Sequence, residues 1–155
     1  MQRSLLTLAV LLLAAAVSGV AEASWAHTHI NKAWSGDLSY REVEDLTKAA
    51  ELVDPATADG YWTLVLLAVH HDASGDQEAG CVLVTRFDAI PKWRKDMRLD
   101  TLRAACSLRR GELEEAAMRA GSAARAAAGT EPIDYIGILF RAHQVRAAAL
   151  VQLAA

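Results

Sequence analysis

Apolar side chains recur every three or four residues along much of the chain, beginning near residue 39. The first run ends at Asp54-Pro55 and consists of Val43, Leu46, Ala50 and Val53. This spacing places apolar side chains on one face of a helix, and proline ends the helix. Ser39, followed three residues later by Glu42, has the pattern of a capping box that opens such a helix. The pattern therefore predicts a helix over residues 39–54.

The same periodicity predicts further helices between breaks in the pattern. They cover residues 57–71, 76–88, 94–109, 112–127 and a last stretch that starts at Ile133. The breaks contain Gly75, Pro91, Gly111 and Pro132. We therefore expect an all-α fold of six helices, arranged as three stacked antiparallel hairpins.

Two of these helices have a well-defined apolar face. Residues 112–127 carry a narrow stripe that lets another helix approach closely and contains Ala116, Ala120, Ala123 and Ala124. In the last helix the apolar stripe contains Phe140, His143, Ala147 and Leu150. We expect both faces to be buried, because amphipathic helices turn their apolar side to the core.

Residues 61–69 and 81–87 allow a second interpretation. Both are short and almost continuous apolar runs, which periodicity alone does not distinguish from buried strands. The loop between them contains Asp, Ser and Gly and would suit a β-hairpin. The helical patterns that flank both runs favour the all-helical fold.

Residues 1–23 have the pattern of a cleavable secretory signal. Arg3 gives a positively charged start, an apolar run covers residues 5–17, and Ala21-Glu22-Ala23 is a small-x-small cleavage motif. The apolar run is shorter than the roughly 20 residues that span a bilayer, so we expect no membrane span after cleavage. We interpret residues 24–36 as a leader and residues 37–155 as the helical domain. The signal and the alanine-rich composition predict export, to a bacterial periplasm.

Helix breakers and small residues recur at an interval of 36. Pro55 and Pro91 are 36 residues apart, and so are Gly75 and Gly111. Ala68 and Ala104 keep the same interval. Periods of this size indicate helical hairpins that stack on one another.

Residues 102–124, LRAACSLRRGELEEAAMRAGSAA, resemble the turn and second helix of the tetratricopeptide repeat family. The family's small-residue positions are occupied by Ala104, Gly111, Ala116 and Ala123, and its bulky position by Leu113. The likeness extends over residues 37–129 and also fits related helical repeat families. It is degenerate, because Gly80 stands where alanine is usual and the last closing proline is displaced to Pro132.

This resemblance implies a right-handed solenoid, or a compact bundle of the same hairpins, that binds other proteins. In the family, the first helix of each hairpin lines a concave groove. The matching positions here include Trp62, Arg98, Thr101 and Arg109, and Arg94 lies one turn before Arg98. Guanidinium groups bind carboxylates well, so we expect a protein or peptide partner of acidic character. The expected function is an adaptor or scaffold in the cell envelope.

Charge is distributed unevenly along the chain. Residues 24–91 contain 11 acidic and 4 basic side chains, a balance of −7, whereas residues 92–155 contain 7 acidic and 11 basic ones, a balance of +4. Ordinary solvated helix faces would give such numbers, and so would a dipolar surface that stacks head to tail or steers an acidic partner. A structural subunit of a larger assembly is a further hypothesis, because the predicted last helix reaches Ala154-Ala155 without a cap. The net charge of −3 and the predicted export argue against nucleic acid as a partner.

No pattern in the chain predicts catalysis or a cofactor. The sequence has no nucleophile elbow, no phosphate-binding glycine loop and no redox cysteine pair. His27 and His29 lie on one side of the predicted leader, which gives an alternative hypothesis of a metal- or small-ligand-binding protein. Cys81 and Cys106 are the only cysteines. Export permits a disulfide between them, and two buried thiols are the other possibility.

Overall fold

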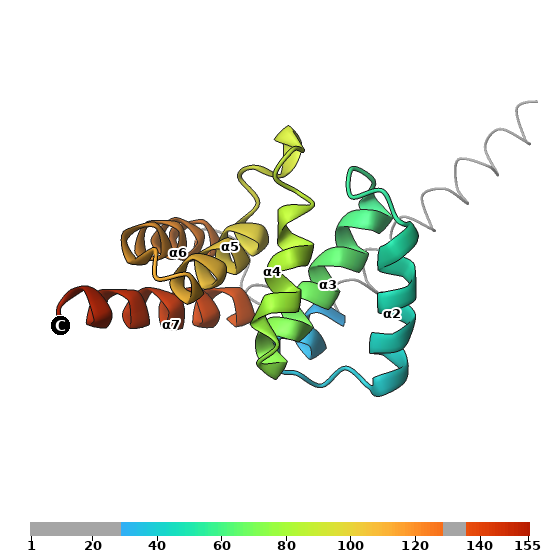
Figure 1. Cartoon of the computed structure of the whole chain (residues 1–155), viewed down its shortest axis with the longest axis horizontal. Coiled ribbons are helices and arrows are strands. Elements are labelled where there is room, and N and C mark those ends of the chain that lie inside the picture. The colour runs from blue at the N-terminus through green and yellow to red at the C-terminus, as the bar shows by residue number, and fades with distance from the viewer. Residues whose placement is uncertain (1–28, 129–135) are drawn as a thin grey trace, which may run out of the picture.

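The computed structural model describes residues 29–128 and 136–155, and in these ranges the regular structure is helical, without a strand (Figure 1). The helices are α2 (Tyr40–Leu52), α3 (Ala58–Ser74), α4 (Gln77–Thr85), the short 3₁₀ helix η1 (Pro91–Trp93), α5 (Met97–Arg109), α6 (Leu113–Ala128) and α7 (Ile136–Leu153). Residues 29–34 form a further helical segment. The all-α prediction is confirmed, and the β-hairpin over residues 61–87 is ruled out. The predicted signal, His27 and Pro132 lie outside the described residues.

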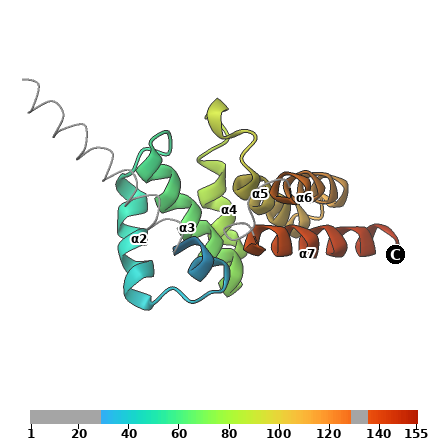
Figure 2. The same cartoon turned by 180° about the vertical axis from the view of Figure 1, so that it is seen from behind.

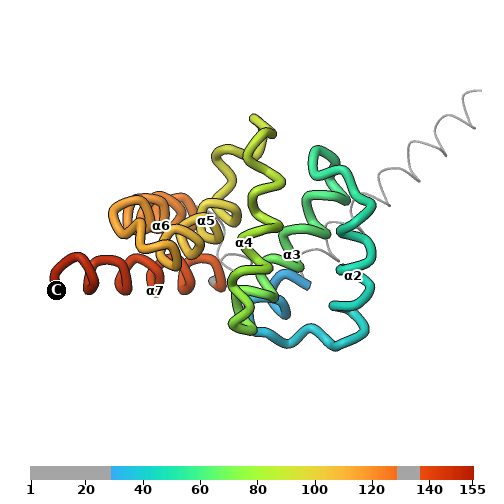
Figure 3. Tube along the Cα trace, in the orientation of Figure 1, coloured from blue at the N-terminus to red at the C-terminus, as the bar shows by residue number. Residues whose placement is uncertain are grey.

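The helices form a bundle in which each of α2 to α7 packs against the next one along the chain. α3 also contacts α5, and α7 contacts α5 as well as α6. Figure 3 shows that α2 and the C-terminal end of α7 lie at opposite ends of the molecule, and the view from behind agrees (Figure 2).

The helix boundaries follow from local hydrogen bonds and from glycine. The Ser39 hydroxyl accepts a hydrogen bond from the Glu42 backbone N–H, and the Glu42 carboxylate accepts one from the Ser39 N–H at 2.7 Å, which completes the predicted capping box. Hydrogen bonds from Ser39 lower the pKa of Glu42 to about 2. Gly75 and Gly111 follow α3 and α5 with φ angles of 90° and 77°. Glycine adopts this left-handed conformation readily, so it ends both helices where the sequence predicts a break.

Four buried aliphatic side chains recur at the 36-residue interval along the described part of the chain. Ile30, Leu66, Leu102 and Ile138 are each at most 2% exposed, and they lie in turn on the segment 29–34, α3, α5 and α7. Alternate helices therefore present corresponding positions to the core. The leader predicted over residues 24–36 thus contains a helical segment that belongs to the core, because Ile30 and Ala33 are both fully buried.

The core changes character between the two halves of the bundle. The N-terminal half is filled by large side chains, among them Leu64, Leu66, Phe87 and Leu99. α6 and α7 meet instead through small side chains, and the alanine stripe predicted on α6 is buried. Close approach of helix backbones therefore replaces interlocking of large side chains in the C-terminal half.

The buried face predicted for α7 is wrong. The buried side chains are Ile138, Ala142, Val145 and Ala149, whereas Phe140, His143, Ala147 and Leu150 are exposed. α7 is apolar around most of its circumference, so its periodicity was compatible with the burial of either of two faces. The face with Ala142 and Ala149 lies inside because small side chains fit closely against the alanines of α6.

An arginine that follows α4 stabilises the end of α2. The Arg86 guanidinium donates hydrogen bonds to the carbonyl oxygens of Ala50 and Val53, the latter at 2.9 Å. Carbonyl groups in the last turn of a helix have no partner within the helix. We expect Arg86→Met to lower the free energy of unfolding by about 2 kcal/mol, because hydrogen bonds from a charged donor contribute about 1.5–3 kcal/mol.

Chemical denaturation followed by circular dichroism measures this loss. The matched control is Arg94→Met, which removes an exposed arginine that has no side-chain hydrogen bond within the described part of the chain. The control should change the free energy of unfolding by less than about 0.5 kcal/mol. Equal effects of the two substitutions would contradict the capping role of Arg86.

Candidate binding cleft

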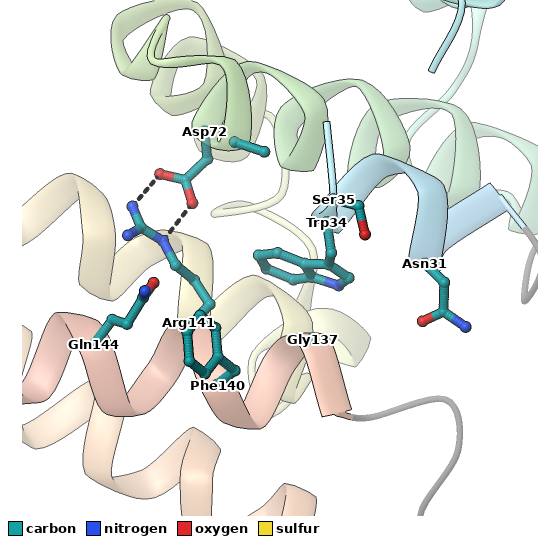
Figure 4. A pocket seen from close by; sticks show the side chains of 9 residues that line it. Asn31, Trp34, Ser35, Asp72, Gly137, Phe140, Arg141 and Gln144 are labelled. Atoms are coloured by element: carbon teal, nitrogen blue, oxygen red, sulfur yellow. Dashed lines mark hydrogen bonds and ion pairs between the residues drawn. The ribbon is translucent and has the colours of Figure 1, made fainter. Parts of the chain in front are cut away.

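A large open cleft lies between the segment 29–34, the C-terminal end of α3 and the N-terminal half of α7 (Figure 4). Its volume is about 670 Å³. It is lined by Asn31, Trp34, Ser35, Asp72, Ala73, Gly137, Phe140, Arg141 and Gln144. Three parts of the chain that are far apart in sequence therefore build one site.

An ion pair between α3 and α7 forms one side of the cleft. Arg141 Nε donates to Asp72 Oδ2 and Arg141 Nη2 donates to Asp72 Oδ1, each at 2.6 Å (Figure 4). This two-pronged geometry is the strongest that arginine forms with a carboxylate. The side chain of Asp72 is 6% exposed and that of Arg141 is 24% exposed. The two charges compensate each other, so this side of the cleft carries no net charge.

Two aromatic side chains shape the rest of the cleft. The indole of Trp34 lies against Gly137 at the start of α7, as Figure 4 shows. The Trp34 Nε1 hydrogen has no acceptor among the described residues, although the atom is buried. Phe140 lies one turn further along α7 and remains largely exposed. An apolar group of a ligand can therefore contact both rings.

The remaining polar side chains of the cleft are neutral. Asn31 and Gln144 end in primary amides, and Ser35 ends in a hydroxyl group. Amide and hydroxyl groups both donate and accept hydrogen bonds. With Asp72 and Arg141 bonded to each other, the cleft offers aromatic contact and uncharged hydrogen bonding, and these are the properties of a binding site.

Glycine at position 137 sets the position of the Trp34 ring. A Cβ atom at Gly137 would lie 2.8 Å from Cγ and 2.9 Å from Cδ1 of Trp34. We expect Gly137→Ala to displace the indole and to lower the free energy of unfolding by about 1–2 kcal/mol, as extra atoms in packed sites do. Near-ultraviolet circular dichroism and chemical denaturation measure the two effects.

The same substitution at Gly121 is the matched control. A Cβ there would have its nearest neighbours, on Arg125 and Arg146, at 3.5 Å, an ordinary contact distance. Because alanine favours the helical backbone over glycine, Gly121→Ala should raise the free energy of unfolding by about 0.5–1 kcal/mol. If both substitutions stabilise the protein, Gly137 does not hold Trp34 in place.

Two of the predicted partner-binding residues do not face a groove. Thr101 is fully buried, and its hydroxyl donates to the Met97 carbonyl oxygen at 2.8 Å. Arg98 is 8% exposed, and its guanidinium lies 5.0 Å from the centre of the Trp62 ring. This side of α5 is turned toward α3, because the two helices pack directly against each other.

Trp62 belongs to an aromatic cluster rather than to the cleft. Its ring lies 5.1 Å from that of Tyr61, which in turn lies 4.3 Å from that of Trp93. Burial raises the pKa of Tyr61 well above its ordinary value. The cluster therefore joins α3 to η1 as part of the core.

Arg109 and Arg94 are exposed, and neither lines the cleft. Arg109 Nη2 donates to Glu78 Oε2 at 2.8 Å, so this arginine joins α5 to α4 at the surface. Arg94 has no ion pair within residues 29–128 and 136–155. The five residues predicted to form one partner-binding surface are thus distributed over buried and exposed positions.

The histidines give no support for a metal site in the described part of the chain. His29 Nε2 lies 3.3 Å from Glu42 Oε1. No group of three or more His, Cys, Asp or Glu side chains among the described residues is placed to hold a metal ion. Burial, and to a lesser extent the neighbouring His71, lower the pKa of His70.

Cys81 and Cys106 form a disulfide that joins α4 to α5. Their Cα atoms are 5.7 Å apart. Of the two possibilities that the sequence left open, the structure contains the covalent one.

The main polar feature of the cleft, the ion pair between Asp72 and Arg141, was not predicted from the sequence. Asp72 and Arg141 are 69 residues apart in the chain. The available signal was an acidic residue three positions after a long apolar run that ends at Val69, and the predicted helix over residues 57–71 ended just before it. Nothing in the residue pattern favoured one partner for Asp72 among the 11 basic residues of the C-terminal half.

Comparison of the chain with protein-family models, with curated proteins and with solved structures finds no match. None of the described helices is both long and apolar enough to cross a bilayer. The cleft itself is therefore the basis for a functional argument.

Proposed function

We propose that the protein is an exported adaptor that binds an extended segment of another polypeptide in the cleft between the segment 29–34, α3 and α7. The observation that carries this proposal is the combination of an exposed ring, Phe140, and a partly buried ring, Trp34, with uncharged hydrogen-bonding groups. A peptide backbone offers one N–H and one C=O group per residue, and the amides of Asn31 and Gln144 match both. Ligand sites commonly combine apolar walls with a few convergent polar groups of this kind.

The repeat pattern supports the same proposal. Buried positions recur every 36 residues from Ile30 to Ile138, and the sequence between residues 102 and 124 resembles a tetratricopeptide repeat. Stacked helical hairpins commonly present an extended surface to another polypeptide. The signal-like pattern of residues 1–23 supports a periplasmic location for this binding. The proposed function is binding alone and includes no catalytic step and no cofactor.

Photo-crosslinking from inside the cleft tests the proposal. A photoreactive amino acid replaces Phe140, which is 63% exposed in the cleft, or Val82 on α4, which is 62% exposed and lies outside it. We expect cells that express the full chain to give a crosslinked polypeptide from position 140 that is absent from position 82.

A second variant makes the result specific to the cleft. Asn31→Ala combined with Gln144→Ala removes two amides that line the site, and it should reduce the crosslink from position 140 at least threefold. A crosslink that persists unchanged in this variant, or that forms equally from position 82, would refute binding in the cleft.

A further inference from the structure

The ends of the molecule differ in charge once the internal ion pairs are taken into account. Within residues 29–128 and 136–155, several acidic side chains of the N-terminal half have a basic partner, among them Glu42, Glu44, Asp72, Glu78 and Asp88. The acidic side chains without one are Asp37, Asp45, Glu51, Asp54 and Asp59. Four of them lie on α2 or in the turns on either side of it, and Asp59 lies in the first turn of α3. Arg41 is the one basic side chain of α2 outside an ion pair in this part of the structure.

The α6–α7 end carries the opposite charge. Arg125 Nη1 and Arg146 Nε both lie 3.5 Å from the position of a Cβ at Gly121, so the two guanidinium groups are close together. Neither has a carboxylate partner among the described residues, and α7 contains no acidic residue. On α6 the acidic side chain without an ion pair in the described structure is Glu114, near the start of the helix.

Apolar side chains are exposed beside both charged groups. Leu150 and Leu153 follow Arg146 at intervals of four and seven residues, so the three share one side of α7. We call Arg125, Arg146, Leu150 and Leu153 the C-terminal face. Tyr40 and Leu52, at the two ends of α2, are more than four-fifths exposed, and Asp45 and Glu51 are exposed between them along the helix. We call these four residues the α2 face.

We propose that copies of this chain associate head to tail, with the C-terminal face of one copy covering the α2 face of the next. The faces have opposite charge, and each adds two exposed apolar side chains that the contact would bury. They lie at opposite ends of the molecule (Figures 1 and 3), so one copy cannot join its own two faces. A contact between two different faces leaves one of each free, and it therefore produces chains of molecules rather than closed dimers.

Sedimentation velocity on the purified protein and on two charge-reversed variants tests the proposal. The α2 variant carries Asp45→Lys and Glu51→Lys, and the C-terminal variant carries Arg125→Glu and Arg146→Glu. All four positions are exposed, and circular dichroism verifies that the variants fold. We expect the unaltered protein to associate at about 0.02 M salt and to dissociate at about 0.5 M salt, because salt screens exposed charges. Each variant alone should have an association constant at least about tenfold lower.

Mixing the two variants distinguishes this geometry from others. Equal amounts of the two should associate again, because every face in the mixture can then meet a face of opposite charge. A C-terminal face that pairs with itself would leave the α2 variant associated, and that result would overturn the proposal. So would an unaltered protein that is monomeric at every salt concentration, or a mixture that stays monomeric. The altered residues lie outside the cleft, so crosslinking from Phe140 reports on the proposed adaptor function separately.

Discussion

Arg141→Met should lower the free energy of unfolding by about 3–5 kcal/mol, the range expected when one partner of a buried ion pair is removed. The substitution keeps most of the side-chain volume but leaves the Asp72 carboxylate without its two hydrogen bonds from arginine. The Asp72 side chain is only 6% exposed, so water replaces those bonds incompletely. Urea denaturation followed by circular dichroism measures the loss.

Two further variants complete a double-mutant cycle. The cycle separates the interaction energy of the ion pair from the effect of removing each side chain by itself. Asp72→Ala should have a smaller effect, about 1–2 kcal/mol, because Arg141 is partly exposed and its charge can turn toward water. Asp72→Ala combined with Arg141→Met leaves no buried charge, so it should be more stable than Arg141→Met alone. If the double variant is the least stable of the three, the ion pair is not what connects α3 to α7.

Reduction of the disulfide between Cys81 and Cys106 produces the second large effect. The bond closes a loop with a sequence separation of 25, and the entropy of the unfolded chain then predicts a stabilisation of roughly 3.5 kcal/mol. We expect a reductant to lower the urea midpoint of the unaltered protein correspondingly. The chain with Cys81→Ala and Cys106→Ala should unfold near the reduced midpoint, and the reductant should not change it further.

This control separates the covalent bond from other effects of the reductant. A reductant that lowers the urea midpoints of the unaltered protein and of the double-alanine variant equally acts on something other than the disulfide. If the reductant does not change the urea midpoint of the unaltered protein, then α4 and α5 are held together by packing alone.

The parts of the fold that the sequence predicted are those with a local cause. The capping box at Ser39, the left-handed glycines at positions 75 and 111, and the alanine stripe of α6 each depend on residues close together in the chain. Their structure follows from hydrogen bonding, backbone sterics and helical periodicity. These signals were sufficient for the all-α fold and for the approximate order of helices.

The parts that were missed depend on contacts between distant residues. α7 has two apolar faces, and the positions of α5 and α6 decide which one is buried. The segment 29–34 is too short to show a helical period by itself, and it is held by the burial of Ile30 and Ala33. For the same reason the cleft could not be predicted, because its walls come from three separate parts of the chain. The partner-binding residues inferred from the family resemblance assumed an open side of α5, which α3 covers.

The alanines that join α6 to α7 have a consequence for the alignment of these two helices. Alanine has no side-chain rotamers to lose, so ordering this contact costs little entropy, but each methyl group also contributes little hydrophobic free energy. Ridges made of methyl groups are shallow, and they oppose the sliding of one helix along the other only weakly. Fixed alignment must then depend on the few larger side chains that α7 buries, Ile138 and Val145, together with the link from Arg141 to Asp72. A change in the volume of either aliphatic side chain should therefore shift the last helix along its axis, within the limit that the link from Arg141 to Asp72 allows.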